Sequence, residues 1–353
     1  MEKYRVGIVG ATGMVGQRFI SLLKDHPWFE VNCVAASARS AGKTYREAVG
    51  ERWAFSWEIP EKVAGMTVVD AADIDEVSKH VDFVFCAVDM KKDEIRALEE
   101  AYAKHEIPVV SNNSACRGIE DVPMVVPEIN ADHLAVIEAQ KKRLGTKNGF
   151  IAVKPNCSIQ SYVPALTPLL DFEPEKVSVC TYQAISGAGK TWPEMVDNVI
   201  PYTGGEDEKS ENEPLKLWGH VEDGKIVNAA LPVISAQCLR VACSDGHMAA
   251  VSVSFKKKPT IEQIKERWAN YETEAQRLEL PSAPKPFLQY FEDPSRPQTR
   301  LDRDFQNGFG VSIGRLREDK LFDYRFVCLS HNTVRGAAGG GILMAELLCR
   351  KGY

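Results

Sequence analysis

A glycine-rich turn near the start of the chain constrains the fold more than any other feature. The segment GATGMVG occupies residues 10–16, after an apolar strand expected at 4–9 and before a helix expected at 14–25. Gly10 permits a tight turn, Gly13 lets the backbone approach a pyrophosphate, and Gly16 allows close packing of helix on strand. Because helix N-termini favour anions, the turn predicts a dinucleotide-binding domain, although its spacing is GxxGxxG rather than GxGxxG.

The pattern after this turn extends the nucleotide-binding domain. Apolar strand signals at 31–36, 81–88 and 108–111 alternate with helix signals, which include a charged helix at 91–105. Such alternation is typical of a parallel sheet with helices on both faces. We therefore predict an α/β protein with a Rossmann-type parallel-sheet domain at 1–150, completed by a C-terminal helix at 332–353.

The chain changes character beyond residue 150. Strand signals are expected at 176–183, 226–236, 247–255 and 321–329, a helix at 260–274, and polar loops at 201–214 and 281–300. A division into two domains also fits the length, because 353 residues exceed one ordinary core. We expect residues 151–331 to form an α+β domain with a mostly antiparallel sheet.

Composition argues against several classes of function. The net charge of −6 gives no reason to expect nucleic acid or an anionic membrane as a partner. The N-terminus lacks a signal-peptide pattern, and no apolar run approaches the roughly 18 residues of a spanning helix. Nine cysteines without CxxC or CxxH spacing argue against a disulfide framework and against a structural zinc site. A reducing cytoplasm is the expected location, and no metal is expected.

The end of the second expected strand bears on the choice of cofactor. A carboxylate there would accept a hydrogen bond from a ribose 2′-hydroxyl. Instead, AASARSAGK carries Ser37, Arg39, Ser40 and Lys43 and no acid. Because a guanidinium pairs well with a phosphate, Arg39 favours NADP over NAD. The alternative is an ordinary solvated basic loop.

A candidate nucleophile lies in KPNCSIQ, residues 154–160, between two apolar runs. Cys157 is expected at a strand-to-helix corner, where a helix N-terminus can help to ionise a thiol. A thiol nucleophile also needs a base, and His247 stands out among seven histidines because it begins a strong strand. Arg240 lies seven residues earlier, so one turn could present both side chains. Taken singly, either residue could instead be structural.

Seven motifs occur in order along almost the whole chain: GATGMVG, SARSAGK, NNSACR, KPNCSIQ, YQAISGAGK, R-x6-H and NTVRGAAGGG. Together they resemble the aspartate-β-semialdehyde dehydrogenase family, in particular its archaeal and fungal-type branch. The resemblance implies an oxidoreductase that converts L-aspartyl-4-phosphate reversibly to L-aspartate-4-semialdehyde with NADPH. It further implies a cysteine thioacyl intermediate and a place on the route to lysine, threonine and methionine.

The resemblance also assigns roles around the thiol. It implies that Cys157 is the nucleophile, that His247 is the acid/base, and that Arg240 binds the substrate α-carboxylate. Gln183, in YQA, would help to orient the substrate near the cysteine. The other matches are Arg117, Asn156 and Lys216 for the phosphate group and Glu213 for the amino group.

The cofactor contacts follow from the same resemblance. The matching positions are Gly10, Thr12, Gly13, Met14 and Val15 in the pyrophosphate turn, Ser37, Arg39 and Ser40 near the 2′-phosphate, Ser186 and Gly187 over the nicotinamide, and Asn332 at its amide. The domain at 1–150 is then NADP-binding, and the domain at 151–331 carries catalysis and dimerisation. A homodimer or homotetramer built through the second sheet is implied.

Three alternatives stay open at the level of sequence. The register of the acidic segment 205–216 is not fixed, so Lys209 could take the place of Lys216. A malonyl-CoA reductase of the same structural group would use the same thiol and imidazole on a CoA thioester. A non-catalytic NADP-binding protein would keep the fold, although an intact Cys157, His247 and Arg240 argue against it.

Overall fold

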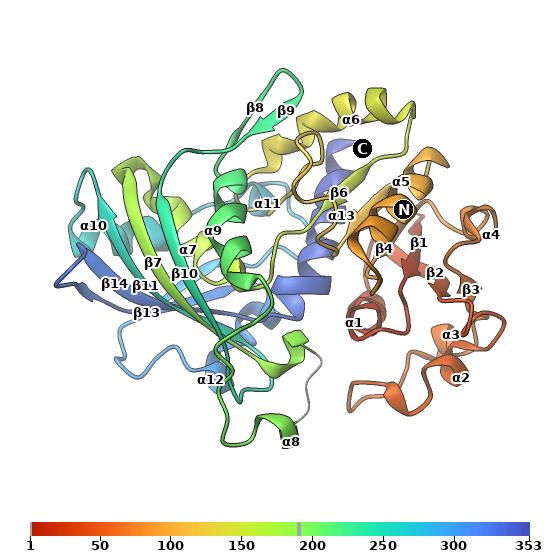
Figure 1. The fold of residues 1–353 in the computed structure, drawn as a ribbon, viewed down its shortest axis with the longest axis horizontal. Helices are drawn as coiled ribbons and strands as arrows, with labels where there is room; N and C mark the ends of the chain where they lie inside the picture. The colour runs from red at the N-terminus through yellow and green to blue at the C-terminus, as the bar shows by residue number, and fades with distance from the viewer. Residues whose placement is uncertain (1, 189–191) are drawn as a thin grey trace.

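Two six-stranded sheets organise the molecule (Figure 1). The structure is a computed structural model that describes residues 2–188 and 192–353. Gly189 and Lys190, the last two residues of the YQAISGAGK motif, lie outside the described residues. Within the described ranges, no helix has both the length and the apolar character needed to span a membrane.

The first sheet is parallel throughout, with the strand order β3-β2-β1-β4-β5-β6. Its strands are β1 (Tyr4–Val9), β2 (Phe29–Ala36), β3 (Val69–Asp70), β4 (Phe83–Cys86), β5 (Val109–Ser111) and β6 (Ile151–Val153). Its helices are α1 (Met14–Leu23), α2 (Tyr45–Val49), α3 (Glu61–Ala64), α4 (Ile74–Ser78), α5 (Lys92–Lys104) and α6 (Ile137–Leu144). In sheets of this order, ligands bind at the carboxyl ends of the strands where the order reverses, here between β1 and β4.

Helix α1 packs on this sheet through one apolar stripe. Phe19, Ile20 and Leu23 are buried, as their helical spacing requires. Helix α13 (Gly339–Lys351) lies close against it, since a Cβ on Gly341 would come within 2.9 Å of the Phe19 ring. The apolar side chains of α13 belong to the same core cluster as those of β1. The C-terminal helix therefore packs with the first domain.

The second sheet is mixed, with the order β10-β7-β11-β14-β13-β12. Its two outer pairs are parallel and its three inner pairs antiparallel. The strands are β7 (Pro174–Gln183), β10 (Val233–Arg240), β11 (His247–Phe255), β12 (Leu288–Phe291), β13 (Val311–Glu318) and β14 (Tyr324–Ser330). A separate hairpin pairs β8 (His220–Glu222) with β9 (Lys225–Val227). The predicted fold class, a parallel Rossmann sheet followed by a mostly antiparallel sheet, is confirmed.

Helices α7 (Val163–Leu166) and α10 (Ile261–Ala269) pack on one face of the second sheet. The other helices in this part of the chain are α8 (Trp192–Met195), α9 (Glu206–Leu217), α11 (Glu274–Arg277) and α12 (Thr299–Asp302). Side chains of α7 and α10 share a core cluster with alternate residues of β7 and β11. The other residues of β11 are only half-buried, so the second face of the sheet stays partly open.

Several expected boundaries differ from the structure. Strand β6 pairs with β5, so the first sheet extends to Val153, past the boundary expected at residue 150. The segment expected as one strand at 226–236 forms β9 and the start of β10, because Pro232 has no N–H to donate to a ladder. The segment 281–300, expected as a loop, contains β12.

The segment 201–214 was expected to be a loop, but residues 206–217 form helix α9. Three acids lie in its first turn, where the positive end of the helix dipole makes negative charge favourable, and so they stabilise the helix. Pro214, inside the helix, cannot bond to the carbonyl of Ser210. The Tyr162 hydroxyl donates to that carbonyl instead, at 2.5 Å, and so compensates for the missing bond.

A buried ion pair ties the C-terminal segment to the first half of the chain. Arg335 lies in a π-helical turn, Val334–Ala338, directly before α13. Its two terminal nitrogens donate to both oxygens of Glu128, at 2.8 and 3.1 Å, and both side chains are almost fully buried. The pair helps to fix the turn that closes one side of the cleft between the sheets.

Candidate active site

The structure brings the predicted nucleophile and the predicted histidine into contact. Cys157 follows β6 and precedes a short helical turn, Ser158–Gln160, so it stands at the strand-to-helix corner expected from the sequence. His247 is the first residue of β11. The Cys157 Sγ and His247 Nε2 atoms lie 3.5 Å apart. Residues 90 positions apart along the chain thus form one reactive pair.

A backbone contact fixes the orientation of the imidazole. The Ala184 N–H donates to Nδ1 of His247 at 3.0 Å, so Nδ1 is an acceptor and the hydrogen of the neutral ring lies on Nε2, facing the sulfur. Burial, together with the nearby charge of Arg240, lowers the pKa of His247 well below its ordinary value. The neutral ring is therefore a hydrogen-bond donor to sulfur. The base role expected from the sequence would need the opposite tautomer.

The surroundings of Cys157 favour the neutral thiol. Burial raises its pKa, and the carboxylate of Glu206 raises it further. Lys154, Arg117 and Arg240 act in the opposite direction but do not reverse the shift. The helical turn that follows has only three residues, so it gives less help than the helix N-terminus expected from the sequence.

Arg240 and Gln183 lie side by side at one end of the second sheet. They are register partners in the β10–β7 pair, and both are buried. Arg240 donates to the carbonyl of Ala184 at 2.8 Å. A Cβ placed on Gly187 would lie 3.0 Å from the Arg240 guanidinium and 3.2 Å from the His247 ring, so the two side chains lie next to each other. Gln183 donates to Thr181 at 3.3 Å. The two predicted residues therefore lie beside the imidazole.

Arg117, Asn156 and Glu213 form a connected polar group beside the thiol. Arg117 pairs with Glu213 at 2.9 Å, and the second oxygen of Glu213 accepts the backbone N–H of Asn156 at 2.5 Å. The Asn156 side chain donates to Glu206 at 2.9 Å. Helix α9 thus contributes two carboxylates to this side of the cleft. The sequence pointed only to Glu213.

Lys216 does not join this group. Its ammonium donates to the carbonyls of Arg117, Ile119 and Val122 at 2.7, 2.7 and 3.0 Å, and the residue is 6% exposed. All three donors of the ammonium are therefore used inside the first domain. Lys209, the alternative, pairs with Glu206 at 2.7 Å.

A groove along the carboxyl ends of the first sheet fits a dinucleotide. It consists of two adjoining cavities of about 570 and 460 Å³ that share Gly13, Ala87, Val88 and Asp89. The first, which we call the outer cavity, is lined by Gly10, Thr12, Ser37, Arg39, Ser40, Lys43 and Arg52. The second is lined by Met14, Val15, Ser186, Gly187, Asn332, Arg117, Lys154, Asn156 and Cys157. The groove therefore runs from the predicted cofactor residues to the thiol.

The glycines of the turn behave as the sequence suggested. Gly10 has φ +90°, and a Cβ there would lie 2.2 Å from the carbonyl oxygen of Ala87. A Cβ on Gly16 would lie 2.3 Å from the oxygen of Gly10. At Gly13 the nearest atom is 3.5 Å away, and no side chain caps α1. The free N–H groups at this helix end suit a pyrophosphate, and a nicotinamide dinucleotide bound here would supply or accept hydride.

Asn332 links the end of β14 to the loop after β7. It accepts the N–H of Gly246 at 2.8 Å and donates to the Ser186 hydroxyl at 2.9 Å. Asn332 and Ser186 line the part of the groove that adjoins Cys157. This bridge positions the segment predicted to cover the nicotinamide.

Four contributors to the site were missed at the level of sequence. Lys154 is 2% exposed and lines the cavity with the thiol. Arg52 lines the outer cavity, Glu206 bonds Asn156, and the backbone of Ala184 orients the imidazole. The KPNC motif could have indicated Lys154, because this residue follows an apolar run directly and lies three residues before the predicted nucleophile.

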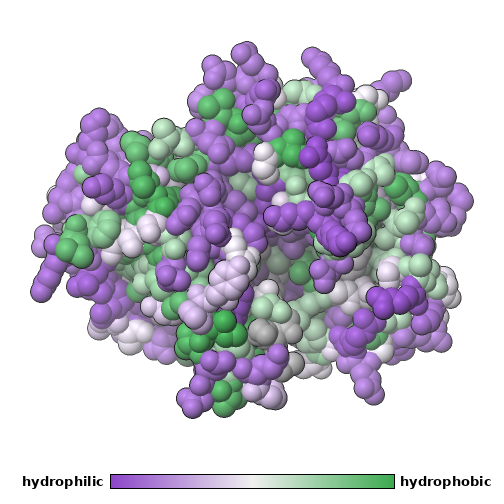
Figure 2. Space-filling model, in the orientation of Figure 1, coloured by the Kyte–Doolittle hydropathy of each residue, from purple (hydrophilic) through white to green (hydrophobic). Residues whose placement is uncertain are grey.

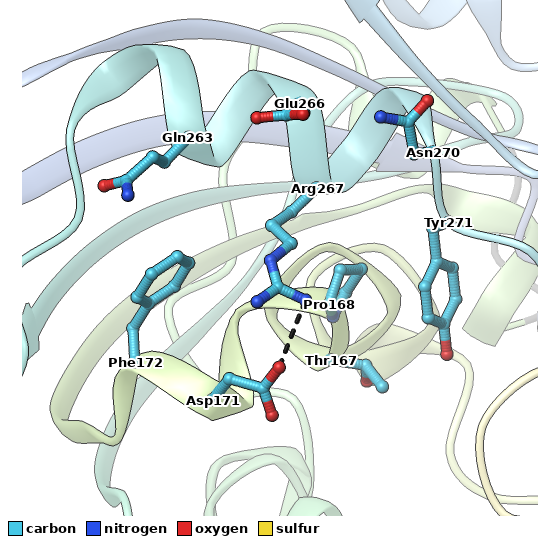
Figure 3. Close-up of a pocket in the computed structure, with 9 residues that line it drawn as sticks. All are labelled: Thr167, Pro168, Asp171, Phe172, Gln263, Glu266, Arg267, Asn270 and Tyr271. Carbon is cyan, nitrogen blue, oxygen red and sulfur yellow. Dashed lines mark ion pairs between the residues drawn. The ribbon is translucent and has the colours of Figure 1, made fainter.

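A second cleft, of about 590 Å³, lies away from this site (Figure 3). It is lined by α10 and by the helical turn Thr167–Phe172, and Arg267 pairs across it with Asp171 at 3.1 Å. None of the predicted site residues lines it. Within the described residues, no group of three or more histidine, cysteine or acidic side chains could hold a metal ion.

A Rossmann groove that ends at a thiol–imidazole pair on a second, mostly antiparallel domain defines a class, the dehydrogenases that act on an acyl group through cysteine. The family models agree. Residues 5–137 match "Semialdehyde dehydrogenase, NAD binding domain", and residues 166–335 match "Semialdehyde dehydrogenase, dimerisation domain".

Full-length relatives narrow the class to one family. The chain is 43% identical to an aspartate-semialdehyde dehydrogenase of Archaeoglobus fulgidus, with 99% of each chain covered. It is 45% identical to that of Schizosaccharomyces pombe, over 99% of this chain and 98% of the relative. A crystal structure of the Candida albicans enzyme with NADP superposes with a TM-score of 0.90, at 39% identity over 99% of each chain. The chain belongs to the aspartate-semialdehyde dehydrogenase family, which confirms the resemblance seen in its motifs.

Proposed function

We propose that the protein reduces L-aspartyl-4-phosphate to L-aspartate-4-semialdehyde and phosphate with NADPH, and catalyses the reverse reaction. The observation that carries this proposal is the 3.5 Å contact between Cys157 and His247 at the end of a dinucleotide groove. Curated relatives of both archaeal and fungal origin bear the corresponding enzyme name. The reaction supplies an intermediate on the route to lysine, threonine and methionine.

The chemistry needs few groups. The Cys157 thiol gives up its proton, its sulfur forms an S–C bond with the acyl carbon, and phosphate leaves with the electron pair of the broken C–O bond; the proton released from the thiol is carried off with the phosphate as hydrogen phosphate. Hydride from the nicotinamide then adds to the thioacyl carbon. The resulting oxyanion collapses to the aldehyde as the C–S bond breaks and the thiolate returns. The Nε2–H of His247 can donate a hydrogen bond to the sulfur and to the developing oxyanion.

The substrate's charges find partners around the thiol. Arg240, with a planar fork of donors, suits the α-carboxylate. The ammonium group needs a carboxylate, and Glu206 and Glu213 both lie within the polar group at Asn156. Arg117 is a cation for the phosphate, although it also pairs with Glu213 at 2.9 Å. These assignments rest on position within the cleft.

The preferred cofactor is NADP. Arg39, Lys43 and Arg52 line the outer cavity together with the hydroxyls of Ser37 and Ser40. Among the described residues that line that cavity, Asp89 is the one acid. The excess of cations there suits a 2′-phosphate, and the related Candida albicans structure holds NADP.

The experiment that tests the function is an oxidation assay with aspartate semialdehyde, inorganic phosphate and NADP. We expect the absorbance of NADPH to rise only when all three are present. The variant Cys157→Ser should retain NADP binding and lose nearly all turnover, since its hydroxyl is a far weaker nucleophile. Unchanged turnover in the variant would contradict the assignment of the nucleophile.

The same assay separates the alternatives. A malonyl-CoA reductase would oxidise NADPH with malonyl-CoA and would be inactive with aspartate semialdehyde and phosphate. A non-catalytic protein would bind NADP and turn over neither substrate. The names of the full-length relatives favour the aspartate reaction.

A second copy of the chain is the proposed protein partner. Exposed apolar side chains gather around α8 and the segment that follows it (Figure 2), where Trp192, Val196, Val199 and Tyr202 are at least half exposed. Val233 is 63% exposed on β10, the outermost strand of the second sheet. Apolar surface of this kind marks an interface. Sedimentation equilibrium would decide between a homodimer and a homotetramer.

A cytoplasmic location is proposed as well. All nine cysteines are free thiols, and several are buried in the core. Free thiols in this number suit a reducing compartment.

A further inference from the structure

A buried carboxylate behind the site has no role in the account so far. Glu99 lies in α5 and is 0% exposed. Among the residues that the structure describes, the hydrogen bonds that it accepts come from neutral groups of Ser111 and Asn113. Glutamate is almost never fully buried unless it is paired, because its charge loses hydration. A fully buried carboxylate with no cation among these partners calls for a functional explanation.

Glu99 binds the turn that follows β5. Its Oε1 atom accepts the Ser111 hydroxyl at 2.5 Å and the side-chain amide of Asn113 at 2.9 Å. The Ser111 hydroxyl in turn accepts the backbone N–H of Asn113 at 3.0 Å. Burial raises the pKa of Glu99, whereas these hydrogen bonds favour its charged form. One carboxylate oxygen therefore joins the last residue of β5 to the turn beyond it.

This turn, residues 112–117, forms one wall of the reaction cavity. Asn112, Asn113 and Arg117 line the cavity that contains Cys157. The Arg117 guanidinium donates to the carbonyl of Asn112 at 3.2 Å, so the turn helps to fix its own arginine. The charge of Arg117 is one of the influences that lower the pKa of the Cys157 thiol. A displaced turn would therefore change both the shape of the cavity and the ionisation of the nucleophile.

The same network reaches the segment that carries the thiol. The carbonyl of Ser111 accepts the backbone N–H of Lys154, three residues before Cys157, at 2.9 Å. Ser111 is thus bound to Glu99 through its hydroxyl and to the thiol segment through its carbonyl. Glu99 itself is not among the described residues that line the cavity. Its effect on the site must pass through the residues that it holds.

We propose that Glu99 is a positioning residue, which holds the turn 112–117 in place beside Cys157. The inference rests on the proposed function, because the site that it orders is the site of that reaction. A leucine would fill a similar volume without burying a charge, but it would leave Ser111 and Asn113 without their shared acceptor. The turn that it holds, rather than the packing of α5, therefore explains the carboxylate.

The test compares Glu99→Leu with Glu99→Gln in the oxidation assay. Glu99→Gln keeps an oxygen that can accept from Ser111 and Asn113, whereas Glu99→Leu removes it. We expect Glu99→Leu to lower kcat roughly 10-fold or more and to leave the KM for NADP within about threefold. Glu99→Gln should keep kcat within about threefold of the wild-type value. A wild-type kcat in Glu99→Leu, or an equal loss in both variants, would overturn the proposal.

A control variant separates position from stability. The buried Tyr324 hydroxyl donates to the carbonyl of Pro259 at 2.6 Å, at the end of β14 that is remote from Asn332. Tyr324→Phe should lower thermal stability, because it removes a buried hydrogen bond, and should leave kcat unchanged. If Tyr324→Phe lost as much kcat as Glu99→Leu, reduced stability would explain both results and the positioning role would be refuted.

A second readout needs no turnover. Without Arg117 held near the thiol, Cys157 in Glu99→Leu should be alkylated by iodoacetamide about threefold more slowly near neutral pH. Glu99→Gln and Tyr324→Phe should react at the wild-type rate. Ser111→Ala removes the hydroxyl that joins Glu99 to the backbone of Asn113, so it should also slow alkylation, by about twofold, and serves if Glu99→Leu does not fold.

The alkylation rates and the assay can fail separately. Unchanged or faster alkylation in folded Glu99→Leu and in Ser111→Ala would refute the role of Glu99. A wild-type chain that does not oxidise aspartate semialdehyde would refute the proposed function, and the alkylation rates would still decide whether Glu99 positions the turn beside the thiol.

Discussion

The thiol of Cys157 is held neutral by its own surroundings. Burial raises its pKa most, and the carboxylate of Glu206 is the next influence in the same direction. Glu206 also accepts a hydrogen bond from Asn156 and pairs with Lys209. One residue thus orders the cleft while it opposes ionisation of the nucleophile. The ammonium of a bound substrate would compensate this charge at the moment when a thiolate is needed.

Neutralising Glu206 should make the thiol more reactive. Glu206→Gln removes the negative charge and keeps an amide oxygen for Asn156, so the pKa of Cys157 should fall. We expect alkylation of Cys157 by iodoacetamide near neutral pH to be about threefold faster or more, which corresponds to half a pKa unit. Peptide mapping after timed alkylation measures this rate. Glu208→Gln, at an exposed position on the same helix, is the matched control and should leave the rate unchanged.

Arg39 should discriminate between the two nicotinamide dinucleotides. It lines the outer cavity with Ser37 and Ser40, where a 2′-phosphate is expected. Arg39→Ala should weaken NADP binding roughly 10- to 100-fold and leave the affinity for NAD within about twofold. Fluorescence titration with both reduced nucleotides measures the difference. The control is Arg46→Ala, at an exposed arginine paired with Glu61. Equal losses for both nucleotides would contradict the cofactor preference.

Local motifs predicted the reactive pair but not its environment. KPNC and the strand that begins at His247 carry their own signals, and the structure brings both residues to one place. Lys154 was missed because a lysine in a sequence is normally expected at the surface. The N–H of Ala184 could not be foreseen at all, since every residue except proline carries one. Lys216 lies apart from the predicted phosphate-binding group because three carbonyls of a distant loop bind its ammonium.

At the scale of elements, helix α9 shows where pattern analysis fails. Its charged sequence and its internal proline are typical of a loop, and α9 has only a weakly apolar face. Contacts with its neighbour explain the helix. Asp207 and Glu211, one turn apart, accept N–H groups of Cys238 and Ala236 on β10, the edge strand of the second sheet. The acids that suggested a solvated loop thus accept hydrogen bonds from backbone N–H groups of an edge strand. In the first domain, β1, β2, β4, β5, α1 and α5 were predicted because their apolar periodicity is complete within each segment. The short elements β3, α2, α3, α4 and α6 were not predicted.

The turn before α13 should depend strongly on its buried ion pair. Arg335→Met removes one partner and leaves Glu128 charged and almost fully buried. Breaking such a pair costs about 3–5 kcal/mol in the free energy of unfolding. Urea unfolding monitored by circular dichroism measures this loss, with the exposed Arg350→Met as the control. A loss under about 1 kcal/mol would mean that water or another cation replaces the arginine.

The whole molecule places its reactive groups where two independent sheets meet. The first sheet contributes the nucleotide turn and, after β6, the thiol, while the second contributes the imidazole and the arginine at the ends of β11 and β10. Most strands of each sheet were predictable from periodicity within their own segments, whereas β3, β12 and β13 were not predicted. The relative placement of the two sheets was not predictable, because it depends on long-range contacts such as the one between Arg335 and Glu128. The family motifs alone indicated that these residues share a cleft.

Lys154 links the site to the stability of the entire chain. The pKa of this group is about 7 in the folded protein, against roughly 10.4 for an unperturbed lysine. Between these values the unfolded chain binds a proton that the folded chain does not, so this group makes stability rise with pH. Its destabilising contribution is complete below pH 7 and fades toward pH 10.4.

Lys154→Met should therefore stabilise the protein in a pH-dependent way. The gain in the free energy of unfolding over the wild-type chain should be largest near pH 7 and should shrink by up to about 1.4 kcal/mol per pH unit above it. Urea titrations at several pH values, in buffers free of phosphate, measure the difference. Phosphate must be absent because a bound anion would restore the charge of the lysine and stabilise the wild-type chain selectively. Lys142→Met, at an exposed site, should show no such trend. A pH-independent difference for Lys154→Met would mean that the buried ammonium keeps its ordinary pKa and is already compensated by protein groups.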